Sequence, residues 1–171
     1  MKPRQLTLAV FVLFVLVLSG RTAAGQPLAS IPASIAASDD IDSTLVSTKR
    51  DIFFSDDWDL PGPPIYKVNG KLFDPTRVDE QVELGNVEEW TIYNVTPEQH
   101  PFHLHVNDFQ VVSVNDQPYN AAGLQDVVAI PANGKVVIRA PFTDFGGKFV
   151  LHCHILYHED HAMMAVVEAV E

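Results

Sequence analysis

The chain has little of several residue types, and each shortage excludes a class of protein. It contains one cysteine among 171 residues, so no disulfide can form within it. Only 11 Lys and Arg accompany 22 Asp and Glu, and a net charge of -11 provides no basic surface for a phosphate backbone. A nucleic-acid partner is therefore not expected. No internal repeat is visible, and the length suits one globular domain rather than a large multi-domain enzyme.

The first 24 residues have the three parts of an export signal. Lys2 and Arg4 form a basic start, residues 6–18 an apolar run, and residues 19–24 a stretch of small residues. As a helix the apolar run is about 20 Å long, shorter than the roughly 30 Å hydrocarbon core of a bilayer. We therefore predict a signal peptide cleaved after Ala24 rather than a stable membrane span, and a periplasmic or extracellular location.

Residues 25–50 are rich in Ala, Ser and Asp, contain Pro27 and Pro32, and have almost no aromatic side chain. Such a composition buries too little apolar surface to fold, so it predicts a flexible, disordered linker. The folded domain is expected over residues 51–171. Its first residues, 51–60, mix aromatic and acidic side chains. A strand or loop packed through Phe53, Phe54 and Trp58 is favoured there over a docking segment.

The remaining residues alternate apolar and polar side chains with a period of two, which is typical of strands. Asn69-Gly70 tolerates the positive φ angles of a tight hairpin turn, here between strands at 65–68 and 71–73. In residues 88–95, Trp90, Ile92 and Asn94 share one face. Further strands are predicted at 77–84, 109–114, 126–130, 135–140, 148–155 and 163–170. The fold class is therefore all-β, a Greek-key β-sandwich without a long helix.

All seven histidines and the cysteine lie between residues 100 and 161, in two short segments. The first is His100-Pro-Phe-His-Leu-His105, and the second begins His152-Cys-His and continues to Met163. In a strand, alternation sends Cys153 to one face and its two histidine neighbours to the other. A following turn can return His158 and Met163 to the Cys153 side, while His100 comes from the loop before another strand.

Two imidazoles, a thiolate and a distant thioether are the ligand set of a blue-copper electron-transfer centre. The opposite face carries two pairs of histidines at i and i+2, and neutral imidazoles at that spacing can hold one or more copper ions. These four are His103, His105, His152 and His154. Six histidines and a cysteine exceed the needs of one tetrahedral zinc site. A serine hydrolase is not favoured either, because no nucleophile elbow is present.

The two segments resemble the copper motifs of the C-terminal, plastocyanin-like cupredoxin domain of multicopper oxidases, the laccase and cuprous oxidase family. The resemblance covers roughly residues 65–171. It implies ligands for type 1 copper at His100, Cys153 and His158 with a weak axial Met163, for type 2 copper at His103, and for type 3 copper at His105, His152 and His154. It also implies that Glu159 is a proton donor, that a phenol, an aromatic amine or cuprous ion is the reductant, and that oxygen is the acceptor.

The chain departs from the family pattern in its number of histidines. The family completes its trinuclear cluster with eight, four of them from a separate N-terminal cupredoxin domain, whereas the matched motifs here provide four. We therefore expect oxidoreductase activity only after assembly, either as a twofold homo-oligomer or with a second chain that carries the missing domain. Val106 and Ala162 stand where many family members have Gly, which affects loop shape rather than ligation.

Two other functions remain open from the sequence. In one, only the type 1 site is filled and the protein is a small electron carrier. In the other, the domain binds copper without redox turnover. For single residues, an ordinary structural role is the favoured interpretation of His161, Met164 and Asp160. A solvated acid is also favoured at Glu159, and no loop identifies a substrate.

Overall fold

The computed structural model describes residues 40–57, 62–120 and 123–171, and within these ranges the chain folds into two β-sheets. The larger sheet has the order β2-β1-β4-β9-β6-β7, and the smaller has the order β3-β11-β10-β5-β8. The strands of the larger sheet are β1 (Val46–Asp57), β2 (Ile65–Val68), β4 (Asn86–Asn94), β6 (Gln110–Val114), β7 (Gln117–Pro118) and β9 (Lys135–Phe142). Those of the smaller are β3 (Glu80–Glu83), β5 (His100–Leu104), β8 (Val127–Ile130), β10 (Gly147–Cys153) and β11 (Met164–Val170).

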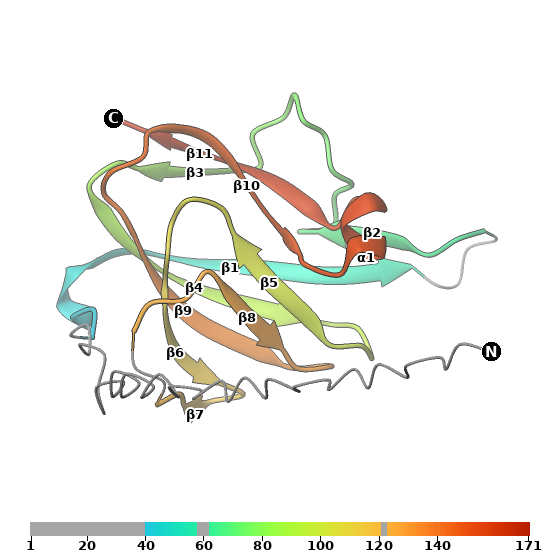
Figure 1. The fold of residues 1–171 in the computed structure, drawn as a ribbon, viewed down its shortest axis with the longest axis horizontal. Helices are drawn as coiled ribbons and strands as arrows, with labels where there is room; N and C mark the ends of the chain where they lie inside the picture. The colour runs from blue at the N-terminus through green and yellow to red at the C-terminus, as the bar shows by residue number, and fades with distance from the viewer. Residues whose placement is uncertain (1–39, 58–61, 121–122) are drawn as a thin grey trace, which may run out of the picture. The chain divides into compact units, whose positions relative to one another are not determined.

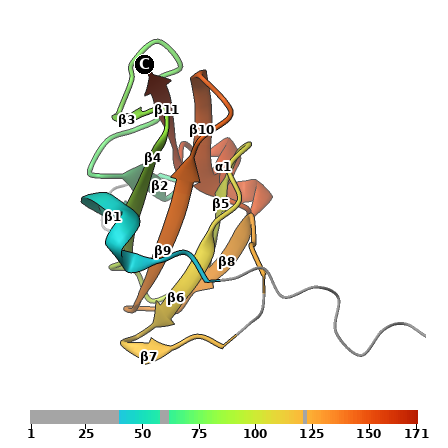
Figure 2. The ribbon, with the colours of Figure 1, turned by 90° about the vertical axis from the view of Figure 1, so that its left-hand side faces the viewer.

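The two sheets pack face to face, with their apolar faces forming a common core (Figures 1 and 2). In β9 every second residue from Val136 to Phe142 is buried, as the period of two predicts. Helices are limited to η1 (Ser43–Leu45) and α1 (Leu156–Asp160) among the described residues. No described helix has the length and apolarity needed to span a membrane. The predicted all-β sandwich is confirmed.

The predicted linker boundary at residue 50 is wrong, because β1 begins at Val46 and pairs in parallel with β4. The sequence gives little sign of this strand since its first residues are polar and exposed. Ion pairs hold this part of β1 in the sheet. Arg50 donates two hydrogen bonds, of 3.0 and 3.1 Å, to the buried Glu88 carboxylate. Arg50 also bonds Glu80 at 2.8 Å. Residues 1–39, which include the predicted signal peptide and most of the linker, lie outside the described residues.

The aromatic start of the domain is a packed strand, as expected. Phe54 is fully buried, and the ring of Phe53 stacks on Tyr93 at 4.8 Å. Trp58 lies outside the described residues. The Asn69-Gly70 turn is confirmed by φ angles of 51° and 71°. The strand predicted at 71–73 is reduced to one bridge at Lys71, because the chain leaves the sheet there.

Two neighbouring strands of the smaller sheet carry the histidine motifs. β5 and β10 are antiparallel, with His103 opposite His152 and Phe102 opposite Cys153. His100 is the first residue of β5 rather than part of the preceding loop, so that expectation was wrong. Pairing with Ile130 of β8 extends the strand to this residue. The helix α1 follows β10 and leads into β11, as Figure 1 shows at the red end of the chain.

Candidate metal centres

The first candidate centre consists of Cys153, His100 and His158, which meet in the core. The Cys153 Sγ atom lies 3.5 Å from His100 Nδ1 and 3.6 Å from His158 Nδ1. The two Nδ1 atoms are 3.1 Å apart. An ion bound by imidazole and thiolate at about 2.0 to 2.3 Å, the bond lengths known for zinc, separates its ligand atoms by roughly 3 to 4 Å. The three atoms therefore fit around one metal ion.

Local structure explains why these residues meet. Cys153 ends β10 and points inward, since alternation places it on the face of Leu151. The predicted turn after it is the helix α1, whose one and a half turns bring His158 back to the core. Met163 is fully buried. Its carbonyl accepts a hydrogen bond from Cys153 N–H, and its own N–H donates to the His158 carbonyl, both at 3.0 Å. The backbone thus holds Met163 beside both ligands.

Burial determines the protonation of this centre. It lowers the pKa of His100 to about 4, with a smaller contribution from His158, and it also lowers the pKa of His158. It raises the pKa of the Cys153 thiol to about 11. Near neutral pH the chain alone therefore presents two neutral imidazoles and a thiol. A metal that binds must displace the thiol proton, and a soft thiolate with two imidazoles is a donor set that copper accepts.

Several contacts around this centre were not predicted. The buried Tyr66 ring stacks on His158 at 4.1 Å, and burial, followed by the charge of Glu98, raises the Tyr66 pKa to about 12. Glu98 Oε2 lies 3.6 Å from His158 Nε2. Thr96 Oγ1 lies 2.7 Å from His100 Nε2. The sequence held one signal of this polar surrounding, namely Asn94, a polar residue on the inward face of its strand.

The second candidate centre lies on the other side of β5 and β10. Ligand atoms of His103, His105 and His152 all lie within 4.8 Å of one another, and the Nε2 atoms of His105 and His152 are 3.0 Å apart. The ring of His154 adjoins them, 5.3 Å from His103 and 5.6 Å from His152 between ring centroids. His154 is exposed, whereas His152 is buried. All four predicted histidines are therefore neighbours.

Hydrogen bonds orient two of these rings. His103 Nδ1 donates to the carbonyl of Asp126 at 2.8 Å, which leaves Nε2 for a ligand. His152 Nδ1 donates to the Cys153 carbonyl at 3.0 Å and lies 3.5 Å from Glu159 Oε2. Glu159, the predicted proton donor, therefore adjoins this centre. Burial is the largest cause that lowers the pKa of His105, followed by its neighbours His103 and His152.

Three other predicted features are placed as follows. His161 lies outside both groups, where its Nδ1 donates to the Tyr157 carbonyl at 2.6 Å and its ring stacks on that tyrosine. Val106 and Ala162 have φ angles of 57° and 79°. The left-handed region strongly favours glycine, so both departures from the family pattern store backbone strain next to predicted ligands.

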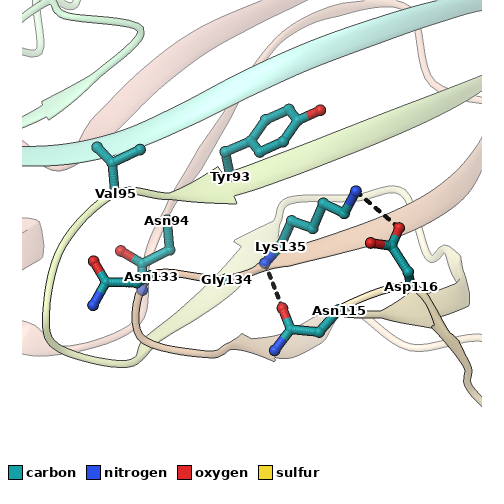
Figure 3. Close-up of a pocket in the computed structure, with 8 residues that line it drawn as sticks. All are labelled: Tyr93, Asn94, Val95, Asn115, Asp116, Asn133, Gly134 and Lys135. Atoms are coloured by element: carbon teal, nitrogen blue, oxygen red, sulfur yellow. Dashed lines mark hydrogen bonds and ion pairs between the residues drawn. The ribbon is translucent and has the colours of Figure 1, made fainter.

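A cavity of about 310 Å³ lies at another part of the surface (Figure 3). Its lining consists of Tyr93, Asn94, Val95, Asn115, Asp116, Asn133, Gly134 and Lys135. Lys135 contributes its amino group to Asp116 at 2.8 Å and its backbone N–H to Asn115 Oδ1 at 2.9 Å. None of the predicted metal ligands lines the cavity, but Asn94 connects it to the loop before His100.

Known proteins share sequence with most of the described chain. The model of the multicopper oxidase family matches residues 39–171. A multicopper oxidase of Staphylococcus haemolyticus is 37% identical over 107 residues, covering 59% of this chain and 24% of that protein. A bilirubin oxidase of Albifimbria verrucaria is 37% identical over 116 residues, 62% of this chain and 20% of that protein.

Solved structures agree on the fold, a cupredoxin-like sandwich. The multicopper oxidase of Campylobacter jejuni superposes with a TM-score of 0.69 at 28% identity, over 74% of this chain and 30% of that one. A laccase of Pediococcus acidilactici gives a TM-score of 0.66 at 33% identity, over 85% and 30%. The chain thus spans less than a third of the length of these relatives.

Proposed function

Because this chain belongs to the multicopper oxidase family, we propose that it is an exported copper-binding redox protein with a type 1 electron-transfer site. In this proposal His100, Cys153 and His158 bind the copper and Met163 is its weak axial ligand. The observation that supports it is the buried contact of one sulfur and two nitrogens at 3.1 to 3.6 Å. Copper bound there would supply one-electron chemistry, because thiolate and imidazole stabilise both of its common oxidation states.

The chain's own residues provide a short route out of this site. Cys153 is bonded in sequence to His152 and His154, which belong to the histidine centre. In addition, His152 Nδ1 donates to the Cys153 carbonyl at 3.0 Å. An electron that enters at the thiolate therefore has a covalent path of one residue to either imidazole. Cys153 is fully buried, so the surrounding core excludes water from its sulfur.

The histidine centre is proposed to provide half of a trinuclear copper site. His103 would bind type 2 copper, and His105, His152 and His154 would bind type 3 copper. In this proposal Glu159, whose Oε2 lies 3.5 Å from His152 Nδ1, would hold a proton for the reduction of oxygen. A second copy of the chain or another cupredoxin-type domain would supply the other four histidines. The assembled protein would then oxidise a phenol, an aromatic amine or cuprous ion.

Copper counting on size-separated protein tests this proposal. An assembled oxidase contains more than one copper per chain, migrates as an oligomer or complex, and shows the intense blue colour of a copper–thiolate bond. About one copper per chain on a monomer would eliminate the assembly. Protein that binds copper without the blue colour would eliminate the type 1 site.

A single-domain electron carrier is the second candidate. It is favoured by the contrast in burial, since Cys153 and His100 are fully buried while His154 is exposed. The buried site therefore has its three strong ligands within one chain. Oxygen uptake with a phenol, an aromatic amine or cuprous ion separates the two candidates, because a carrier reacts with these reductants without consuming oxygen.

A further inference from the structure

The ring of His100 has a second polar contact, on the side away from Cys153. Its Nε2 atom lies 2.7 Å from Thr96 Oγ1, while its Nδ1 atom lies 3.5 Å from Cys153 Sγ. Both His100 and Thr96 are fully buried. A neutral imidazole carries one hydrogen, and only the nitrogen without it can bind a metal. The direction of the Thr96 hydrogen bond therefore decides which nitrogen of His100 is available.

Asn94 determines that direction. The Thr96 backbone N–H donates to Asn94 Oδ1 at 3.0 Å, so this atom is the amide oxygen. Asn94 Nδ2 lies on the other side, where it donates to the carbonyls of Glu98 at 2.6 Å and Pro131 at 2.9 Å. If the amide were reversed, its NH₂ group would face the Thr96 N–H, donor against donor. Its oxygen would face the two carbonyls, acceptor against acceptor. The partners thus allow only one orientation of Asn94.

Besides His100, the Thr96 hydroxyl has one donor and two acceptors around it. The Glu98 backbone N–H donates to Oγ1 at 3.3 Å, and the other two contacts are oxygens. Oγ1 lies 2.8 Å from Asn94 Oδ1 and 3.2 Å from the Glu98 carbonyl, and neither oxygen carries a hydrogen. The single hydroxyl hydrogen goes to one of them, most directly to the nearer Asn94 Oδ1. Toward His100 the hydroxyl oxygen can only accept. His100 Nε2 must therefore be the protonated nitrogen, and Nδ1 has the free lone pair.

We propose that Thr96, oriented by Asn94, is a positioning residue that holds His100 in its metal-binding tautomer. The lone pair of His100 Nδ1 then faces Cys153 and His158 before any metal arrives. The assignment of that lone pair to copper rests on the proposed function, whereas the tautomer is a property of the metal-free chain.

The loop that carries Thr96 is also fixed from the side of the cavity in Figure 3. Asn94 N–H donates to the Gly134 carbonyl at 2.8 Å, and Asn133 N–H donates to the Thr96 carbonyl at 2.9 Å. These bonds tie the residues before His100 to the turn before β9. Because backbone groups hold the loop, removing the Thr96 hydroxyl should affect the imidazole more than the fold.

The tautomer is measured by long-range ¹H–¹⁵N NMR of the metal-free full chain. The wild type is expected to carry its hydrogen on His100 Nε2. Thr96→Val removes the acceptor while keeping the shape, so the Nδ1-protonated form should become populated. Thr96→Ser keeps the hydroxyl and should restore the wild-type tautomer. Thr48→Val, at an exposed position of β1, is the matched control and should change nothing.

Copper affinity of the buried site provides a second measurement. Loss of a partner that orients a ligand costs about 10- to 100-fold, so Thr96→Val should weaken copper binding by this factor, and Thr96→Ser should bind within a few-fold of wild type. The proposal is overturned if wild-type His100 is protonated on Nδ1. It is also overturned if folded Thr96→Val retains both the wild-type His100 tautomer and the wild-type copper affinity. If Thr96→Val does not fold, the tautomers measured in the wild type and in Thr96→Ser decide. Failure of wild type to bind copper would contradict the proposed function, and the metal-free spectra would still decide the tautomer.

Discussion

The two candidate centres share the peptide His152-Cys153-His154 but differ in how completely the chain builds them. At the Cys153 centre the three contacting residues are 5% exposed or less, and every ring has a partner that fixes it. At the histidine centre, the His154 ring is exposed, and the three clustered imidazoles have no sulfur among them. The end of β10 thus contributes ligands to a buried site in the core and to a more exposed site at the surface. This difference is the reason for our proposal that the Cys153 centre is complete within one chain, whereas the histidine centre needs ligands from a partner.

The largest effect is expected from removing the sulfur of Cys153. Cys153→Ser should abolish the blue absorption completely, because a buried hydroxyl does not replace the copper–thiolate bond. Copper bound by the histidine centre should remain, measured by elemental analysis after dialysis. Simultaneous loss of all copper from folded protein would contradict the separation of the two centres.

The reciprocal change removes a ring from the open centre. His105→Ala deletes the nitrogen that lies 3.0 Å from His152 Nε2, so the copper bound by this centre should be lost while the blue absorption remains. His161→Ala is the control, since His161 lies outside both groups. Loss of the blue colour in folded His105→Ala would show that the two sites do not fill independently.

The number of protons released on copper binding distinguishes the Cys153 centre from the histidine centre. Burial raises the pKa of the Cys153 thiol to about 11 and lowers the pKa of both His100 and His158, so copper binding at pH 8 should release about one proton at the buried site. Copper affinity there should fall about tenfold for each unit that the pH decreases from 8, and more steeply once His158 and His100 also bind protons. Cys153→Ser, which lacks the thiol, should lose this proton release. Calorimetry in buffers of different ionisation enthalpy measures both quantities.

The smallest expected effect concerns backbone strain beside the open centre. Val106 follows His105 with a φ of 57°, and its side chain is 56% exposed. Val106→Gly should raise the free energy of unfolding by about 1 kcal/mol, because relief of left-handed strain exceeds the entropy that glycine adds to the unfolded chain.

Val95→Gly is the matched control for that change. Val95 is 59% exposed and is not among the described residues with positive φ, so glycine should destabilise the chain there. Chemical denaturation of the metal-free chain measures both variants. Equal destabilisation by the two glycines would contradict the strain at residue 106.

The sequence predicted most of the sandwich and the division of its histidines, for a physical reason. Strand alternation is local, so the opposite directions of Cys153 and His152 follow from their adjacency alone. The first residues of β1, 46–50, were not predicted because Arg50 and Glu88, distant in sequence, stabilise a segment that shows no apolar alternation. The start of the domain was therefore placed too late.

The surroundings of the buried centre were not predictable in the same way. Tyr66 reaches His158 from another strand, and this contact depends on how the sheets pack rather than on spacing. Thr96 lies four residues before His100, yet its role depends on the orientation of Asn94 and on carbonyls of other loops. A pattern in the sequence can assign ligands, whereas the groups that orient them emerge only from tertiary structure.

The most direct test of the account is anomalous diffraction at the copper absorption edge from crystals of the copper-loaded chain. We expect an anomalous peak in the core from a copper ion bonded to Cys153 Sγ, His100 Nδ1 and His158 Nδ1. Copper found only among His103, His105 and His152, with the Cys153 sulfur unbound, would contradict it.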